Sequence, residues 1–289
     1  NFYMSLGASY KGIKDYDRSL EANQKAVDFF ESMPNGHPFM DQLYANIGMT
    51  YFDKLDLENA QSYLDKSMEM ALAKFPETHP SMVTRYTAYA KLYEEKKEHQ
   101  KALEYWEKAA AVEAARSGPK SSRIAQFKSK QGAVYFNSLK DPLKALEFYE
   151  KALAAMDLTS WVEGNTYPLN QLTREQPTVM LGICHGYSLS LQKQNRDKAF
   201  ELILAAEKLV DSTRSEYLTE SSKLELASNS RQLYELGIEL AFKLYQETGK
   251  QVYLENAFRL SEKSKALLLL LSLKHVQALQ SSEIPEAVL

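Results

Sequence analysis

The sequence predicts an all-α solenoid, a stack of about six pairs of antiparallel helices. Two observations favour this class. A pattern of small and aromatic residues recurs with a period near 42, and the 289 residues include only 11 glycines and 9 prolines, few for a turn-rich β fold. One helix pair cannot bury its apolar surface alone, so we expect neighbouring pairs to stack and share a continuous core.

The first helix of each predicted pair carries a large residue, a small residue and then a tyrosine three positions later. The small residues stand at 7, 48, 90 and 132, which gives spacings of 41, 42 and 42. We expect the small residues to let the two backbones of a pair approach closely, with a tyrosine filling the space beside them. The four segments are Leu6-Gly7-x-x-Tyr10, Ile47-Gly48-x-x-Tyr51, Tyr89-Ala90-x-x-Tyr93 and Gln131-Gly132-x-x-Tyr135.

The second helix of each pair carries another small residue 12 or 13 positions later, followed by two more positions at helical spacing. Steps of three, four and seven residues lie on one face of a helix. Four regular pairs are therefore predicted within residues 1–156. Their second-helix patterns are Ser19-x-x-x-Asn23-x-x-Ala26, Ala60-x-x-x-Leu64-x-x-Ser67, Ala102-x-x-x-Trp106-x-x-Ala109 and Ala145-x-x-x-Tyr149-x-x-Ala152.

Beyond residue 156 the pattern becomes irregular. Residues 157–177 contain Trp161, Gly164, Pro168 and Pro177, so we expect an enlarged connector there. Two divergent helix pairs are predicted within residues 178–279, the first with Ala199-x-x-x-Ile203-x-x-Ala206 in its second helix. We expect residues 280–289 to form a linker.

This pattern resembles the tetratricopeptide repeat, in its longer variety of about 42 residues found in kinesin light chains. His37-Pro38 and His79-Pro80 stand 42 apart, each just before a first helix, where the fixed φ angle of proline suits an opening turn. The resemblance covers residues 1–156. It implies a right-handed superhelix whose concave face is lined by the first helices, and a role in binding proteins or peptides.

The segment from Tyr253 to Leu269, together with Glu283-Ile284-Pro285, resembles the helix and linker that precede the peptidase domain of bacterial CHAT proteins, which are caspase-like enzymes. The resemblance implies the regulatory or sensor repeat region of such a protein, a bacterial cytoplasmic location, and a C-terminal peptidase domain as a partner. The chain begins at Asn1 already in helical pattern, so we expect it to be a piece of a longer protein.

A leucine-rich run in the last predicted helix is apolar all the way round, more than a one-sided face can bury. Three interpretations are open: neighbouring helices cover it, a further domain docks on it, or it pairs with a second copy in a self-associating scaffold. The candidate residues for such an interdomain or dimer surface are Leu267, Leu268, Leu270 and Leu271.

Composition argues against several other function classes. With 35 basic and 38 acidic residues the net charge is −3, so we expect no nucleic-acid partner. No apolar run reaches the roughly 18 residues of a membrane span, and no cofactor motif occurs. The five histidines lack metal-ligand spacing. Cys184 and His185 point about 100° apart on a helix, which disfavours a nucleophile pair. We therefore expect a non-catalytic protein.

Candidate binding residues follow from the usual repeat geometry, which selects four positions on each first helix. Asn46 matches the asparagine with which kinesin-light-chain-like repeats hold a ligand backbone, and lysines at these positions attract acidic groups. The alternative is that these side chains are merely solvated. The predicted peptide-binding residues are Gln42, Asn46, Met49, Asp53, Lys91, Lys130 and Asn137, and the same rule also selects Thr84, Ala88, Glu95, Gln126 and Ala133.

Overall fold

The computed structural model describes residues 2–34, 37–157, 176–214 and 220–281. Within these ranges, side chains are described except at 176, 212–214, 220–225, 227–229, 267–268 and 270–281. The described ranges contain twelve α-helices and no strand. The predicted all-α class is therefore confirmed, and the described ranges contain as many helices as six pairs require.

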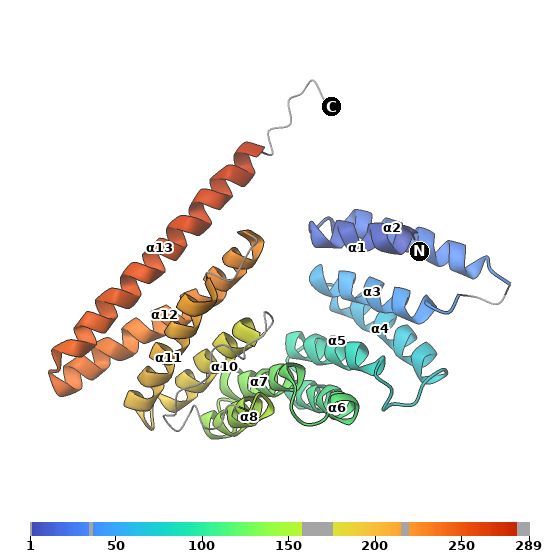
Figure 1. The fold of residues 1–289 in the computed structure, drawn as a ribbon. Helices are drawn as coiled ribbons and strands as arrows, with labels where there is room; N and C mark the ends of the chain where they lie inside the picture. The colour runs from blue at the N-terminus through green and yellow to red at the C-terminus, as the bar shows by residue number, and fades with distance from the viewer. Residues whose placement is uncertain (1, 35–36, 158–175, 215–219, 282–289) are drawn as a thin grey trace. The chain divides into compact units, whose positions relative to one another are not determined.

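The chain forms two compact units, residues 1–139 and 140–289. In unit 1, each helix contacts the next one along the chain, and α3 also contacts α1 and α5 (Figure 1). This is the neighbour-to-neighbour contact pattern of a helix-pair stack. The helices of unit 1 are α1 (Phe2–Gly12), α2 (Tyr16–Glu31), α3 (Met40–Asp53), α4 (Leu57–Leu72), α5 (Met82–Glu95), α6 (His99–Ser117) and α7 (Ser122–Asn137).

Unit 2 contains the divergent pairs. In this unit α10 contacts α8, α11 and α12, and α12 also contacts α11 and α13. The two helices of the fourth predicted pair, α7 and α8, belong to different units. The helices of unit 2 are α8 (Pro142–Ala155), α10 (Gln176–Leu191), α11 (Arg196–Arg214), α12 (Glu220–Thr248) and α13 (Gln251–Ser281).

Most of the predicted connector and terminal linker lies outside the described residues, which exclude 158–175 and 282–289. The predicted boundaries at 156 and 177 and the handedness of the superhelix therefore stay predictions.

The close approach of the two helices within a pair is confirmed at Gly48. A Cβ atom added there would lie 2.9 Å from Cγ of Leu64 and 3.1 Å from the backbone oxygen of Ala60. Contacts this short mean that a Cβ atom would force Leu64 to shift, so glycine favours the close packing of α3 against α4. Tyr51 packs beside them, in the apolar cluster that contains Ala60 and Leu64.

The turn inside each pair contains a left-handed residue followed by an acidic residue, a feature that the sequence did not predict. Lys14, Leu55, Lys97 and Lys140 all adopt positive φ angles between 55° and 63°. Each is followed by an acidic residue that precedes the second helix. Among these, the carboxylates of Asp15, Asp56 and Asp141 accept a hydrogen bond from a backbone N–H three residues later. The left-handed residue ends one helix, and the aspartate caps the next.

The two His-Pro segments start first helices as predicted. Nδ1 of His37 accepts a hydrogen bond from the backbone N–H of Phe39, at 3.2 Å, and Nδ1 of His79 accepts one from Ser81, also at 3.2 Å. Each imidazole also stacks on a phenylalanine from the preceding second helix or the turn after it, His37 on Phe30 and His79 on Phe75. The histidines therefore stabilise the turn just before each first helix, whose N-cap residues are Phe39 and Ser81.

Candidate functional site

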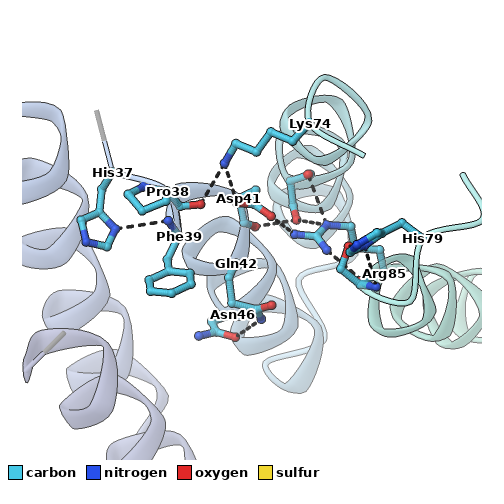
Figure 2. Close-up of polar contacts among 11 residues, drawn as sticks. His37, Pro38, Phe39, Asp41, Gln42, Asn46, Lys74, His79 and Arg85 are labelled. Atoms are coloured by element: carbon cyan, nitrogen blue, oxygen red, sulfur yellow. Dashed lines mark hydrogen bonds and ion pairs between the residues drawn. The ribbon is translucent and has the colours of Figure 1, made fainter. Parts of the chain in front are cut away.

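The polar centre of the predicted binding face is an amide pair on α3. Nε2 of Gln42 donates a hydrogen bond to Oδ1 of Asn46 at 3.1 Å, one helical turn away (Figure 2). Both side chains are half-buried. The bond orients the Asn46 amide so that its NH₂ group is left to donate, while Oε1 of Gln42 is left to accept. Side chains in this arrangement can bind both the C=O and the N–H of an extended peptide.

The other two predicted residues of α3 are engaged within the protein. Met49 is half-buried and packs on the apolar cluster around Leu64 and Leu92. Asp53 is exposed, and its carboxylate lies 3.1 Å from Nζ of Lys11 on α1. Met49 can thus offer an edge of apolar surface, whereas Asp53 offers a charge that is already paired.

Lys91 on α5 and Lys130 on α7 are exposed, and within the described residues neither ammonium group forms a hydrogen bond or an ion pair. Both charges act on Glu94, a half-buried carboxylate on α5. Burial raises the pKa of Glu94, and the hydrogen bond from Nε1 of Trp106 and the two lysine charges oppose that shift. Glu94 was missed from the sequence because nothing in the repeat pattern marks its position.

The remaining predicted positions differ in exposure. Asn137, the last residue of α7, is exposed, as are Thr84, Glu95 and Gln126. The sequence also placed Ala88 on this face, but Ala88 is only 4% exposed because it packs in the cluster that joins α3 and α4 to α5.

A buried charged cluster lies next to the amide pair and was also missed (Figure 2). Arg85 on α5 is 2% exposed, and its Nη2 atom pairs with Oδ2 of Asp41 on α3. Its Nη1 atom donates to the backbone oxygen of Ser81 at 2.9 Å, and its Nε atom donates to Oγ of Ser67 on α4 at 3.1 Å. Nζ of Lys74 donates to Oδ1 of Asp41 at 2.9 Å. The guanidinium is therefore bonded to α3, to α4 and to the start of its own helix.

The predicted leucine surface lies on α13, but the side chains of Leu267, Leu268, Leu270 and Leu271 lie outside the described residues. The neighbouring Leu269 is 62% exposed. An interdomain or dimer role for this run stays a prediction.

Two kinds of chemistry can be compared with the described residues, metal binding and nucleophilic catalysis by Cys184. No three histidine, cysteine or acidic side chains among them could hold a metal ion. Burial raises the pKa of the Cys184 thiol and lowers the pKa of His185, which disfavours the thiolate–imidazolium pair of a nucleophilic site. None of the described helices is long and apolar enough to cross a membrane.

Comparison with known proteins gives the class of the fold. Residues 39–112 match the family model of the tetratricopeptide repeat. This stretch contains most of the second and third predicted pairs, so the chain contains tetratricopeptide repeats, and its fold is of the all-α tetratricopeptide type. A search of the curated proteins finds no match.

Solved structures with a similar fold are also found. BtubC (BKLC) from P. vanneervenii is 16% identical with a TM-score of 0.58, covering 74% of this chain and 80% of that one. A putative kinesin light chain from Podosopora anserina, with nearly identical TPR-like repeats, is 18% identical with a TM-score of 0.52, covering 80% of this chain and 96% of that one. At these identities the likeness concerns the fold alone, and it agrees with the kinesin-light-chain-like repeats that the sequence predicted.

Proposed function

We propose that this chain is a non-catalytic scaffold that binds a protein or an extended peptide on the first-helix face of unit 1. The observation that carries the proposal is the oriented amide pair Gln42–Asn46, together with the two exposed lysines that have no ion-pair partner among the described residues, Lys91 and Lys130. Tetratricopeptide repeats are generally non-catalytic scaffolds suited to protein binding, which supports the same function.

Binding on this face would rest on two kinds of contact. The Asn46 and Gln42 amides would bond to the ligand backbone, which fixes its direction without reading its sequence. Lys91 and Lys130 would add charge-assisted hydrogen bonds to carboxylates of the ligand. Because rigid helices carry all four side chains, little ordering is needed on binding, and modest contacts suffice for useful affinity.

An array of immobilised peptides of acidic, basic and neutral composition tests the proposal. We expect the wild-type chain to bind acidic peptides best, and Asn46→Ala combined with Lys91→Ala to weaken that binding about tenfold or more, the loss of one neutral and one charged hydrogen bond. The matched control removes one amide and one lysine elsewhere on the surface, Gln194→Ala with Lys25→Ala, and should bind like the wild type. Equal binding by both double variants would remove the basis for this face.

We also propose, more narrowly, that the chain is the regulatory or sensor region of a CHAT-type protein located in the bacterial cytoplasm. The support is the residue pattern of 253–269 together with Glu283-Ile284-Pro285. The test is the gene sequence that follows Leu289. A His-Gly motif with a later cysteine in a predicted strand is expected, and a continuing coding sequence without them contradicts this narrower proposal.

A second candidate function, a self-associating scaffold, is favoured by the exposure of Leu269 on α13. Contiguous exposed apolar surface is typical of protein–protein interfaces, and Leu269 lies within a leucine-rich run that could supply it. Sedimentation velocity over a wide concentration range would show a dimer that Leu269→Glu abolishes. A wild-type chain that stays monomeric at every concentration would exclude this function.

A further inference from the structure

Three first helices carry different kinds of side chain at one equivalent position of the repeat. Leu43 on α3, Arg85 on α5 and Phe127 on α7 stand 42 residues apart, and all three are buried, with exposures of 0%, 2% and 3%. Leu43 and Phe127 fill this position with apolar surface. Arg85 places a guanidinium in the same slot, between the second and third helix pairs.

The partners of Arg85 also replace residues that are apolar or small in the other repeats. Asp41 aligns with Val83 and Ala125, and Ser67 aligns with Ala26 and Ala109. Oγ of Ser67 donates to the backbone oxygen of Asp41 at 2.6 Å while it accepts from Arg85, so α3, α4 and α5 meet in one connected network. Burial lowers the pKa of Arg85 and the charge of Asp41 opposes that shift, as expected for a desolvated but paired group.

Net stabilisation does not explain such a cluster, because apolar residues of similar volume often serve a buried position as well or better. The cluster differs from apolar packing because its hydrogen bonds depend on direction. Apolar contacts tolerate sliding of one helix along another, whereas hydrogen bonds weaken steeply with distance and angle. A shift between α3 and α5 would leave the buried guanidinium of Arg85 without some of its partners, which costs a large amount of free energy.

We propose that Asp41, Ser67 and Arg85, here called the polar lock, fix the register between α3 and α5 and so set the spacing of Asn46 and Lys91. The consequence for ligands rests on the proposed function, but the geometric claim does not. The three lock residues are positioning residues that contact no ligand. α3 and α5 contact each other directly, so the lock acts across a real helix–helix boundary.

The test measures distances between spin labels by pulsed electron paramagnetic resonance. Asp53, Glu95 and Asn137 are exposed and stand at equivalent places near the ends of α3, α5 and α7. Labels on Asp53→Cys and Glu95→Cys report the joint with the lock. Labels on Glu95→Cys and Asn137→Cys report the next joint, which serves as the internal control. Cys184→Ser removes the only native cysteine from every sample.

The variant replaces the lock with residues found at the equivalent positions, Asp41→Val, Ser67→Ala and Arg85→Leu. We expect the 53–95 distance distribution to broaden or shift, the 95–137 distribution to stay unchanged, and circular dichroism to show intact helices. An unchanged 53–95 distribution in the folded variant overturns the proposal. If the triple variant does not fold, Ser67→Ala alone decides, because it removes two bonds of the lock without adding volume: broadening supports the lock, and no change overturns it. No ligand is used, so the result is independent of the binding experiment.

Discussion

The joint between the second and third helix pairs and the joint between the third and fourth pairs solve the same packing problem in different ways. At the first, Arg85 is bonded to Asp41 and Ser67. At the second, Phe127 packs on Trp106 with ring centroids 5.8 Å apart. Both positions are almost fully buried, so the fold does not need charge there. The second joint has charge elsewhere, since Arg123 on α7 lies 3.6 Å from the buried carboxylate of Glu113 on α6. The comparison therefore shows that this one position accepts either apolar or charged residues, and that stacking does not require the polar lock.

The largest effect is expected from Arg85→Leu, which breaks the lock on one side. Asp41 would then remain buried, with only the half-exposed Lys74 as a charged partner. Removing one partner of a buried pair costs about 3–5 kcal/mol, and the remaining lysine places the expected loss in the free energy of unfolding near the lower end. Urea denaturation of the variant and the wild type measures it. A loss below about 1 kcal/mol would show that the pair is effectively solvated.

Replacing all three residues of the polar lock should restore the free energy of unfolding that Arg85→Leu alone loses. With Asp41→Val and Ser67→Ala added to Arg85→Leu, no buried charge remains at the site of the lock, and we expect stability within about 1 kcal/mol of the wild type or above it. The same urea series reports this value. A triple variant as unstable as Arg85→Leu alone would mean that the lock is a source of stability, and the contrast between the two joints would lose its meaning.

A second comparison concerns packing inside a helix pair, where Asn23 is a buried polar residue. It is 1% exposed, its Oδ1 atom has no hydrogen-bond partner among the described residues, and it lies against Gly7 in the place that Leu64 takes against Gly48. An unpaired buried polar atom costs about 1–3 kcal/mol, so Asn23→Leu should stabilise unit 1 by about 1–2 kcal/mol in thermal or urea unfolding. The reciprocal control, Leu64→Asn, should destabilise it by about 2–4 kcal/mol. A destabilised Asn23→Leu would show that the amide makes a bond that this geometry does not reveal.

The smallest effect concerns the turn inside a pair. Leu55 is 72% exposed and has a φ angle of 62°, a conformation that costs a residue with a Cβ atom about 1–2 kcal/mol. Glycine removes that cost but loses about 0.5–1 kcal/mol of chain entropy, so Leu55→Gly should stabilise by about 0.5 kcal/mol. Ala73→Gly, at an exposed end position with a φ angle of −67°, is the matched control and should destabilise instead. The same sign for both variants would contradict the conformational explanation.

The helix pairs could be predicted from the sequence because small residues at a fixed period report backbone contacts directly. Gly48 and Ala60 illustrate this, since their spacing predicted the close approach that the structure shows. The polar lock could not be predicted in the same way, because Asp41 and Arg85 are 44 residues apart and pair only after the stack has formed. The sequence did contain one indication of it. Arg85 is charged, whereas the equivalent positions of the neighbouring repeats hold the apolar residues Leu43 and Phe127.

The candidate binding face was only partly accessible to sequence reasoning. The spacing of Gln42 and Asn46 places them one turn apart, but their mutual orientation depends on which rotamers the neighbouring helices allow. Ala88 shows the opposite failure, because a position rule assigned it to the surface and packing against α3 and α4 buried it. Glu94 accepts a hydrogen bond from the indole of Trp106 on another helix, and no local sequence pattern predicts this contact.

Hydrogen–deuterium exchange, with and without the best-binding peptide of the array, shows which helices of unit 1 the ligand covers. We expect the peptide to slow exchange in α3, α5 and α7, around Asn46, Lys91 and Lys130, and to leave the second helices α4 and α6 unchanged. Protection confined to α4 and α6, or confined to unit 2, would show that the first-helix face is not the binding surface.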